Sequence, residues 1–245
     1  MSARSTSERD EDGFQNRGAE VTRAEAFFDA AFAFAITLMV ISIDEIPDSA
    51  EKLLNALKAV PAFAASFLLI VLFWRAHADW SRHYGLNDRH SQRLSLLMVF
   101  LVLVFIYPLR MFFGAFFEWI SQGMLPAQLT ISDTSDVRRI MIVFASGFGL
   151  MGATTMSLYR HAWSKRERLS LDARETLITR YAVLRWSMVP LISLISLLLS
   201  IGLAGAVENV WLVAMPGLVF FVLLVSRPLL NWKLRRALSR LEEST

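Results

Sequence analysis

Six apolar runs, each long enough to cross a membrane as a helix, decide what this chain can fold into. A helix rises about 1.5 Å per residue, so roughly 20 residues cross a hydrocarbon core of about 30 Å. A helix also satisfies its own backbone hydrogen bonds, which lipid cannot do for it. The sequence therefore predicts an all-α polytopic membrane protein with six transmembrane helices, at about 24–43, 53–75, 94–117, 138–160, 182–204 and 209–228.

The placement of Lys and Arg predicts the orientation of these helices. Of the 25 basic residues, 20 lie in the N-terminal segment, in two alternate connections and in the C-terminal segment. Cytoplasmic segments carry the excess of Lys and Arg, so both termini are expected in the cytoplasm. Residues 1–22 are polar and mixed in charge, which indicates a disordered cytoplasmic tail. The transmembrane domain is expected over 23–232, and a basic, polar cytoplasmic tail over 233–245.

Composition excludes several classes of function. The chain has no cysteine, so it has no disulfide, no thiol nucleophile and no Cys-ligated metal. Its four histidines form no metal-binding pair, and it has no Gly-x-Ser-x-Gly motif, so we expect neither a metal site nor an enzyme. The formal net charge of +3 comes from basic residues in short connections, which does not indicate a nucleic-acid-binding surface.

The predicted spans also lack the features of coupled transporters and of carbonyl-filter channels. Coupled transporters generally hold their ion with an ionisable residue or a broken helix near mid-membrane, and the middles of all six runs are free of such residues. No Thr-Val-Gly-Tyr-Gly motif is present. The remaining functions are passive ones: a pore constricted by apolar side chains, or a membrane scaffold.

The first run has two different sides when it is drawn as a helix. Charges at three positions in residues 23–29 precede fourteen uncharged residues, 30–43. At 100° per residue, Phe34, Thr37 and Ile41 fall within about 60° of one another. Glu25 and Asp29 point to the opposite side. The side with the hydroxyl carries these residues: Arg23, Phe27, Ala30, Phe34, Thr37, Leu38 and Ile41.

This division indicates a pore-lining side and a packing side. Ionisable groups in a span are costly unless they are paired. We therefore expect Glu25 and Asp29 to accept hydrogen bonds from Arg or His side chains of neighbouring helices. Periodicity alone leaves a second interpretation equally open, in which this helix is buried in a bundle and holds one structural ion pair.

Two local patterns predict how later helices begin and pack. Asp172 and Glu175 have the spacing that caps the start of a helix. Ala145, Gly149 and Ala153 repeat every four residues, and small residues at this spacing allow close helix contact. We expect that contact to lie within one subunit.

Two motifs in the first two runs resemble those of a known family. Arg23-x-x-x-Phe27-Phe28-Asp29, followed by Ala-Phe-Ala-Ile-Thr-Leu, resembles the Arg-x-x-x-Phe-Ser-Asp signature of the endolysosomal-type potassium channels and their prokaryotic relatives. In the second run, Phe-Trp74-Arg-Ala-His77 resembles that family's Phe-Trp-x-x-His. The pattern of six spans extends the resemblance over about residues 20–232.

The resemblance implies a homotetramer in the lipid bilayer of a bacterial inner membrane, conducting potassium ions without a cofactor. In such channels the first helix of each subunit lines one central pore with rings of apolar and hydroxyl residues. By position, Phe34 corresponds to the narrow ring, Thr37 to the hydroxyl ring and Ile41 to the next apolar ring, with Leu38 also facing the ion path.

The resemblance also implies a hydrogen-bond network that holds the first helix against the second and third. Arg23 and Asp29 correspond to its charged members on the first helix, and Trp74 and His77 to their partners on the second. The expected structural set on these two helices is Arg23, Glu25, Phe27, Asp29, Trp74 and His77.

Two departures from the family pattern keep a second function open. Phe28 replaces the serine of the signature, and Phe34 replaces the usual aliphatic residue of the narrow ring. Four phenyl rings around an axis would close a pore tightly, and an apolar constriction resists wetting. The alternative to a potassium-preferring channel is a non-conducting scaffold or accessory protein that retains the channel fold.

Overall fold

The computed structural model of the chain describes residues 9, 13–18, 20–41, 48–127, 131, 133–203 and 210–243. These residues form helices and no β-strand, which confirms the all-α prediction. The helices of this described part are α1 (Arg23–Ile41), α2 (Ala50–Leu57), α3 (Val60–Tyr84), α4 (Arg89–Ile120), α5 (Thr134–Ser164), α6 (Ala173–Gly202), α7 (Val210–Leu218) and α8 (Phe221–Glu243).

Five stretches of the described chain are long and apolar enough to cross a membrane. They are α3, α4, α5, α6 and Met215–Glu243, which runs from the end of α7 through α8. The shorter α1 has 19 residues and carries three charged residues in its first two turns, and it is not among the five.

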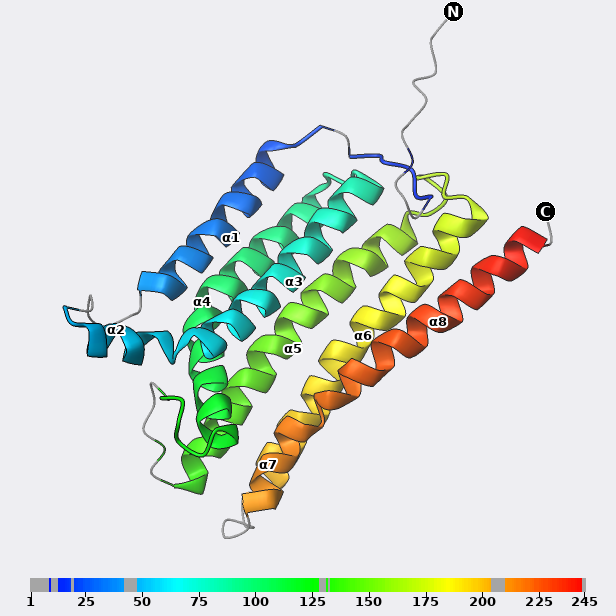
Figure 1. Ribbon diagram of the computed structural model, residues 1–245. Helices are drawn as coiled ribbons and strands as arrows, with labels where there is room; N and C mark the ends of the chain where they lie inside the picture. The colour runs from blue at the N-terminus through cyan, green and yellow to red at the C-terminus, as the bar shows by residue number, and fades with distance from the viewer. Residues whose placement is uncertain are drawn as a thin grey trace, which may run out of the picture.

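The long helices stand side by side in an extended bundle (Figure 1). α5 packs on both α4 and α6, α8 packs on α6, and α1 packs on α3 and α4. α1 and α8 therefore occupy opposite edges of the bundle. Both described ends of the chain lie at the same end of the bundle, because Arg9 pairs with Asp172 and Glu242 pairs with Arg174, close by on α6.

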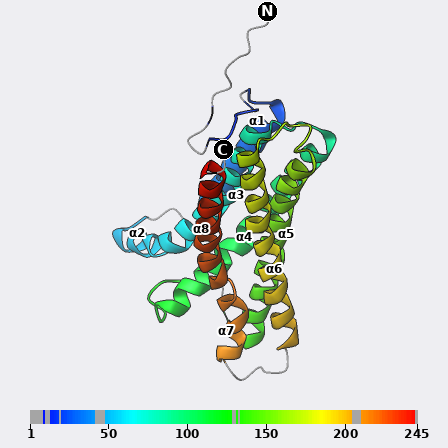
Figure 2. The ribbon, with the colours of Figure 1, turned by 90° about the vertical axis from the view of Figure 1, so that its right-hand side faces the viewer.

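The second apolar run, predicted as one span at 53–75, forms two helices in the structure. Residues Ala50–Leu57 form α2, which has no buried residue and projects sideways from the bundle (Figure 2). The long helix begins later, with Pro61 in its first turn, and continues to Tyr84. Proline lacks a backbone N–H and is tolerated at that position, so Pro61 marks a helix start. The predicted span at 53–75 included this position.

The predicted cap of α6 is confirmed. The Asp172 carboxylate accepts a hydrogen bond from the backbone N–H of Glu175 at 2.8 Å. In return the Glu175 carboxylate accepts one from the backbone N–H of Asp172 at 3.1 Å, which completes a capping box.

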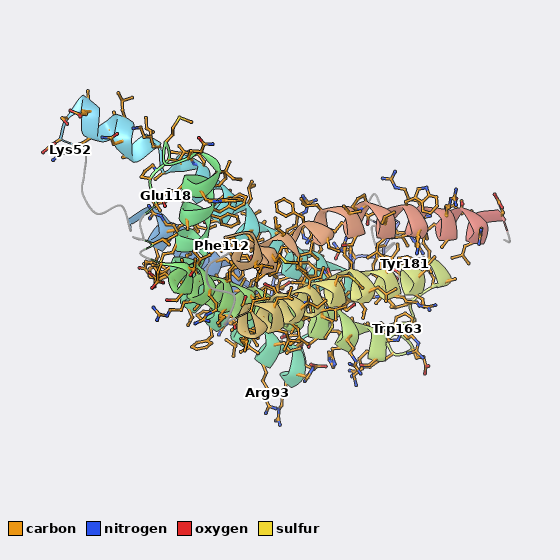
Figure 3. All side chains as sticks on the ribbon, turned by 90° about the horizontal axis from the view of Figure 1, so that it is seen from below. Lys52, Arg93, Phe112, Glu118, Trp163 and Tyr181 are labelled. Carbon is orange, nitrogen blue, oxygen red and sulfur yellow. The ribbon has the colours of Figure 1, made fainter. Side chains whose placement is uncertain are left out.

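The centre of the bundle is filled by aromatic rings and by close contact of α5 with α6. Phe112 of α4 lies among the helices, whereas Lys52 of α2 lies far from them (Figure 3). The ring of Phe112 stacks on Phe144 of α5 with centroids 3.7 Å apart. A Cβ added at Gly149 would lie 2.8 Å from Ser193 Cβ of α6, so part of the predicted small-residue seam serves contact within the subunit.

Candidate functional site

One side of α1 is buried against α3 and α4. Its residues recur at helical spacing and are at most 2% exposed: Phe28, Phe32, Ala35 and Met39. These apolar side chains fix which way α1 faces, because turning the helix would take them out of the core.

The opposite side of α1 is uncovered in the subunit. Phe34 is 58% exposed and Phe27 is 57% exposed. Thr37 is exposed, and its hydroxyl donates to the carbonyl of Phe34 at 2.7 Å. Leu38 is half-buried at the edge of this side, and the side chain of Ile41 lies outside the described residues. The side that the helical wheel marked as pore-lining is therefore not covered by the subunit's other described helices.

The two carboxylates of α1 contact α3. Asp29 accepts a hydrogen bond from the indole Nε1 of Trp74 at 2.8 Å. Glu25 accepts one from the hydroxyl of Ser81 and another from the backbone N–H of Thr22 at 2.7 Å. The expectation of Arg or His donors was wrong, because α3 presents an indole and a hydroxyl at these positions. Neutral donors stabilise a carboxylate without a second ion that must also be desolvated.

Arg23 and His77 are not joined to the Asp29–Trp74 pair among the described residues. Arg23 is exposed at the start of α1. His77 is 4% exposed and lies under the ring of Phe28, with centroids 3.5 Å apart and nearly parallel planes. Its Nε2 lies 2.8 Å from Ser95 Oγ of α4. Phe28, which replaces the signature serine, thus packs where a hydroxyl would stand and covers this histidine.

Near the start of α1 a cavity of about 340 Å³ lies between the chain preceding α1, the end of α3 and the start of α4. Glu20 and Glu25 contribute carboxylates to its wall, and Ser81, Asn87 and Gln92 contribute neutral polar groups. The part of the chain that the structure describes has no group of three His, Cys, Asp or Glu residues able to hold a metal ion.

Arg110 holds the other end of α1, and the sequence analysis missed this role. It lies within α4, inside the predicted span at 94–117, and is 5% exposed. Its Nη1 donates to the carbonyl oxygen of Met39 at 2.8 Å. Met39 is in the last turn of α1, where carbonyls lack helical partners and favour a cation. A lone arginine two residues after Pro108 in an otherwise apolar run was the signal available in the sequence.

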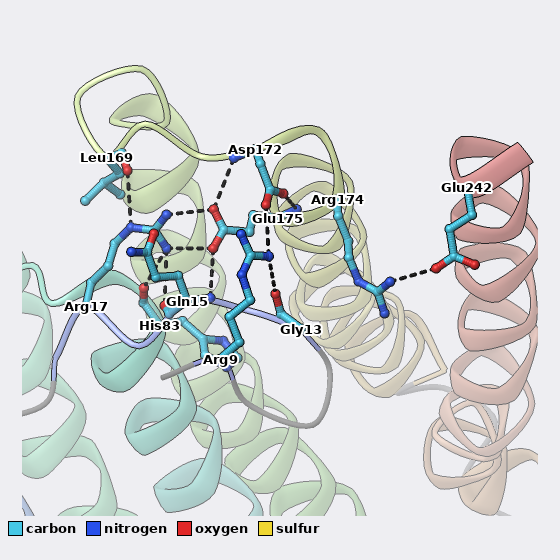
Figure 4. Close-up of polar contacts among 10 residues, drawn as sticks. All are labelled: Arg9, Gly13, Gln15, Arg17, His83, Leu169, Asp172, Arg174, Glu175 and Glu242. Atoms are coloured by element: carbon cyan, nitrogen blue, oxygen red, sulfur yellow. Dashed lines mark hydrogen bonds and ion pairs between the residues drawn. The ribbon is translucent and has the colours of Figure 1, made fainter. Parts of the chain in front are cut away.

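The segment 13–18 is packed, although it belongs to the region that the sequence indicates as a disordered tail. Phe14 is completely buried and stacks on His83 with ring centroids 4.2 Å apart. Arg17 donates to both carboxylate oxygens of Glu175, at 2.9 and 2.6 Å (Figure 4). The backbone N–H of Gln15 donates to the same carboxylate at 2.8 Å. This segment, five residues before α1, therefore ties α1 to the end of α3 and the start of α6.

Asp88 joins α4 to α5 in the connection that follows α3. Its carboxylate caps α4 by accepting from the backbone N–H groups of His90 and Ser91, at 3.0 and 2.9 Å. His161 Nε2 of α5 lies 2.7 Å from its other oxygen. Burial alone would raise the pKa of Asp88, but the hydrogen bonds from Ser91 and His161 outweigh it and lower the pKa to about 2.

Comparison with known proteins gives consistent matches to one group of channels. The profile of the family described as endosomal/lysosomal potassium channel TMEM175 matches residues 23–108, which include α1 and α3. A protein named potassium channel from Marivirga tractuosa is 31% identical over 193 residues, covering 74% of this chain and 76% of that protein. Another potassium channel, from Streptomyces collinus, is 37% identical over 98 residues, which is 38% of this chain and 47% of that protein.

Two solved structures share the fold. The crystal structure of a variant of the potassium channel MtTMEM175 superposes with a TM-score of 0.77 at 23% identity, covering 97% of this chain and 100% of that one. The TMEM175 homologue from Chamaesiphon minutus, described as a lysosomal potassium-selective channel homologue, gives 0.53 at 22% identity over 85% of this chain and 97% of that one. On the sequence identity to the Marivirga protein and the profile match, the chain belongs to the TMEM175 potassium channel family, a family of channels and not of enzymes.

Proposed function

We propose that this chain forms a potassium-preferring cation channel, with passive conduction through a central pore lined by α1 of each subunit in a homotetramer. One observation carries the proposal: the side of α1 with Phe34 and Thr37 is exposed, while the other side is packed against α3 and α4. An exposed row of phenyl groups and a hydroxyl needs a partner surface, and copies of the same helix around an axis supply one. The names of the relatives favour potassium as the permeant ion.

The topology that we propose has six spans with both termini in the cytoplasm of a bacterial cell and the helices in its inner membrane. At 1.5 Å per residue α1 is about 28 Å long, close to the hydrocarbon thickness of about 30 Å. α1 added to the five long apolar stretches makes an even number of crossings, which agrees with both described ends of the chain lying at one end of the bundle.

In this channel the chain holds α1 from both ends. The bonds from Trp74 to Asp29 and from Ser81 to Glu25 fix the cytoplasmic end to α3. The bond from Arg110 to the Met39 carbonyl fixes the outer end to α4. These contacts set the rotation of α1, and therefore keep Phe34 and Thr37 toward the axis.

The width of the pore at Phe34 decides whether ions pass. A ring of four phenyl groups gives a constriction that is both narrow and apolar, and such constrictions gate by excluding water. Thr37 follows one turn further along α1 and supplies the one hydroxyl on the exposed side of the described helix. Conduction is expected to be slow in the resting protein and to increase when the phenyl ring is removed.

Ion flux in liposomes tests the proposal. Purified full-length protein is reconstituted, and flux driven by potassium, sodium and caesium gradients is compared for wild type, Phe34→Ala and Phe100→Ala. Phe100 is 61% exposed, against 58% for Phe34, and it belongs to α4, so it is a matched phenylalanine on another helix. We expect potassium flux to rise in Phe34→Ala and to stay at the wild-type level in Phe100→Ala, with potassium preferred over sodium in the wild type.

The alternative, a non-conducting scaffold, is favoured by the phenylalanines at positions 28 and 34. It predicts no flux above empty liposomes in wild type and in Phe34→Ala alike. Native mass spectrometry of the detergent-solubilised protein distinguishes the channel from the scaffold by oligomeric state. A pore lined by α1 requires a closed ring of four subunits, and a monomer would contradict the channel proposal.

A further inference from the structure

The short helix α2 carries leucines that the rest of the described subunit leaves uncovered. Leu53, Leu54 and Leu57 are 51%, 63% and 52% exposed, and no residue of α2 is buried. Leucine is among the side chains most often buried. A group of exposed leucines on one helix therefore marks a surface that meets something outside the subunit.

The three leucines gather on one side of α2. At 100° per residue they fall within about 100° of one another. Glu51, Lys52 and Asn55 fall on the opposite side, and all three are exposed. Lys52 Nζ also pairs with the carboxylate of Asp48 at 3.0 Å, outside the helix. α2 is therefore amphipathic, with an apolar side that no described helix covers.

The connection to α3 holds α2 at the end of a membrane-length helix. α2 ends at Leu57 and α3 begins at Val60, and α3 is long and apolar enough to cross a membrane. Val60 is itself 47% exposed, so exposed apolar side chains continue from α2 onto α3. α2 runs crosswise to the long helices (Figure 2). A crosswise helix at the end of a span lies along the plane of the membrane surface.

A second segment has the same character at this end of the bundle. The end of α4 projects to the same side as α2 (Figures 2 and 3). Trp119 and Ile120 in this last turn of α4 are 52% and 56% exposed. Tryptophan is enriched where the membrane meets water. Two separate segments thus indicate the boundary of the bilayer at the level of α2.

We propose that α2 lies in the outer interface of the bilayer, with its three leucines among the acyl chains and its polar side toward the head groups and water. Amphipathic helices of this kind bury their apolar side about 5–10 Å into the boundary between head groups and acyl chains. α2 needs little affinity of its own for lipid, because its link to α3 keeps it at the surface. The choice of the outer leaflet rests on the proposed function and topology, in which both termini are cytoplasmic and α2 lies at the other end of the bundle (Figure 1).

Fluorescence quenching of single labelled positions tests this placement without measuring conduction. The chain has no cysteine, so one introduced cysteine at a time can be labelled with bimane in the full-length protein. The protein is then placed in nanodiscs of phosphatidylcholine and phosphatidylglycerol, and quenching by acyl-chain-brominated lipid is compared with quenching by aqueous iodide. Two positions lie on the leucine side and two on the polar side, and the variants are Leu54→Cys, Leu57→Cys, Lys52→Cys and Asn55→Cys. Asn55 is the matched control for Leu54, because it is exposed and adjacent in the same helix.

We expect brominated lipid to quench the label at Leu54 and Leu57, and iodide quenching there to be largely lost, because a group about 5–10 Å below the boundary is out of reach of a hydrated anion. The reverse is expected at Lys52 and Asn55. Either leucine position serves if the other variant does not fold. Equal quenching at Leu54 and Asn55 would contradict the proposal. A label at Leu54 that neither quencher reaches would also contradict it, because the leucines would then lie against a neighbouring subunit.

A label on α8 separates this proposal from the proposed function. Leu224 of α8 is 68% exposed, and α8 occupies the edge of the bundle opposite α1. Brominated lipid should quench the label in Leu224→Cys wherever α2 lies. Lipid quenching at Leu224 with only iodide quenching at Leu54 would overturn the placement of α2 and leave the channel. Lipid quenching at both positions without ion flux would overturn the channel and leave the placement of α2.

Discussion

Replacing Arg17 by methionine should destabilise the protein more than replacing any of the exposed charged residues near it. Glu175 is 1% exposed and Arg17 is 13% exposed, so their contact lies almost entirely out of water. Arg17 also donates through Nε to the carbonyl of Leu169 at 3.1 Å. Methionine fills much of the same volume but leaves a buried carboxylate without its cation.

The size of the effect depends on the hydrogen bonds that the Glu175 carboxylate retains. Removing one partner of a buried ion pair costs about 3–5 kcal/mol, because the other charge stays buried. The backbone N–H groups of Gln15 and Asp172 continue to donate to the Glu175 carboxylate. We therefore expect the lower end of the range, about 3 kcal/mol, which corresponds to a fall of about 6–12 °C in Tm for a chain of this size.

The assay is thermal unfolding of the full-length protein in detergent, followed by circular dichroism and tryptophan fluorescence. Arg9→Met is the matched control, because Arg9 and its partner Asp172 are 56% and 41% exposed, and such pairs contribute at most about 1 kcal/mol. In the variant with both Arg17→Met and Glu175→Gln, no unpaired charge remains buried at this pair's site, so the double variant should be more stable than Arg17→Met alone. If Arg17→Met and Arg9→Met unfolded at the same temperature, the buried Arg17–Glu175 pair would contribute no more to stability than the exposed Arg9–Asp172 pair.

Three further changes give distinct results. Trp74→Phe removes the indole donor to Asp29, and since Asp29 is exposed we expect a loss of about 1 kcal/mol in unfolding free energy by chemical denaturation. Gly152→Ala would put a Cβ 2.3 Å from Val189 Cγ1, so we expect about 1–3 kcal/mol of destabilisation in the same assay, against little change in Gly202→Ala, which has open space. The pKa of Asp88 is lowered from 3.8 to about 2 in the fold, so its contribution to stability is present above pH 3.8 and is lost as the pH falls toward 2. Asp88→Asn should therefore flatten the dependence of Tm on pH in this range, and parallel curves for variant and wild type would contradict the assignment.

The faces of α1 could be predicted from the sequence because two independent signals coincide on one short helix. The 3.6-residue period placed Phe34 and Thr37 together, and the charges at Glu25 and Asp29 marked the other direction. The structure buries Phe28 and Phe32 and exposes Phe34, as packing against only one side of a helix requires. The family resemblance implied Trp74 as a partner of Asp29, and the structure shows this hydrogen bond. The Ser81 donor to Glu25 could not be predicted, because a hydroxyl on α3 satisfies a carboxylate as well as a cation does.

Contacts between distant parts of the chain could not be predicted from the sequence. Arg17 and Glu175 are 158 positions apart, and nothing in either local sequence selects the other. A polar, mixed-charge segment indicates disorder on average, but one buried phenylalanine and one buried ion pair are enough to fix residues 13–18. The role of Arg110 was missed for the same reason, because nothing near it in the sequence indicates that its partner is the carbonyl of Met39, 71 positions away.

The supports of α1 differ in chemistry at its two ends, and the helix dipole explains the difference. The first turn of a helix exposes backbone N–H groups and favours negative charge, and α1 carries Glu25 there. The last turn exposes carbonyls and favours positive charge, which Arg110 brings from α4 to Met39. Each charge thus stabilises α1 itself and also joins it to a neighbouring helix. A helix held in this way keeps one side exposed and does not rotate that side into the subunit's core. The proposed pore requires this orientation, because the exposed side must meet the same side of the other copies.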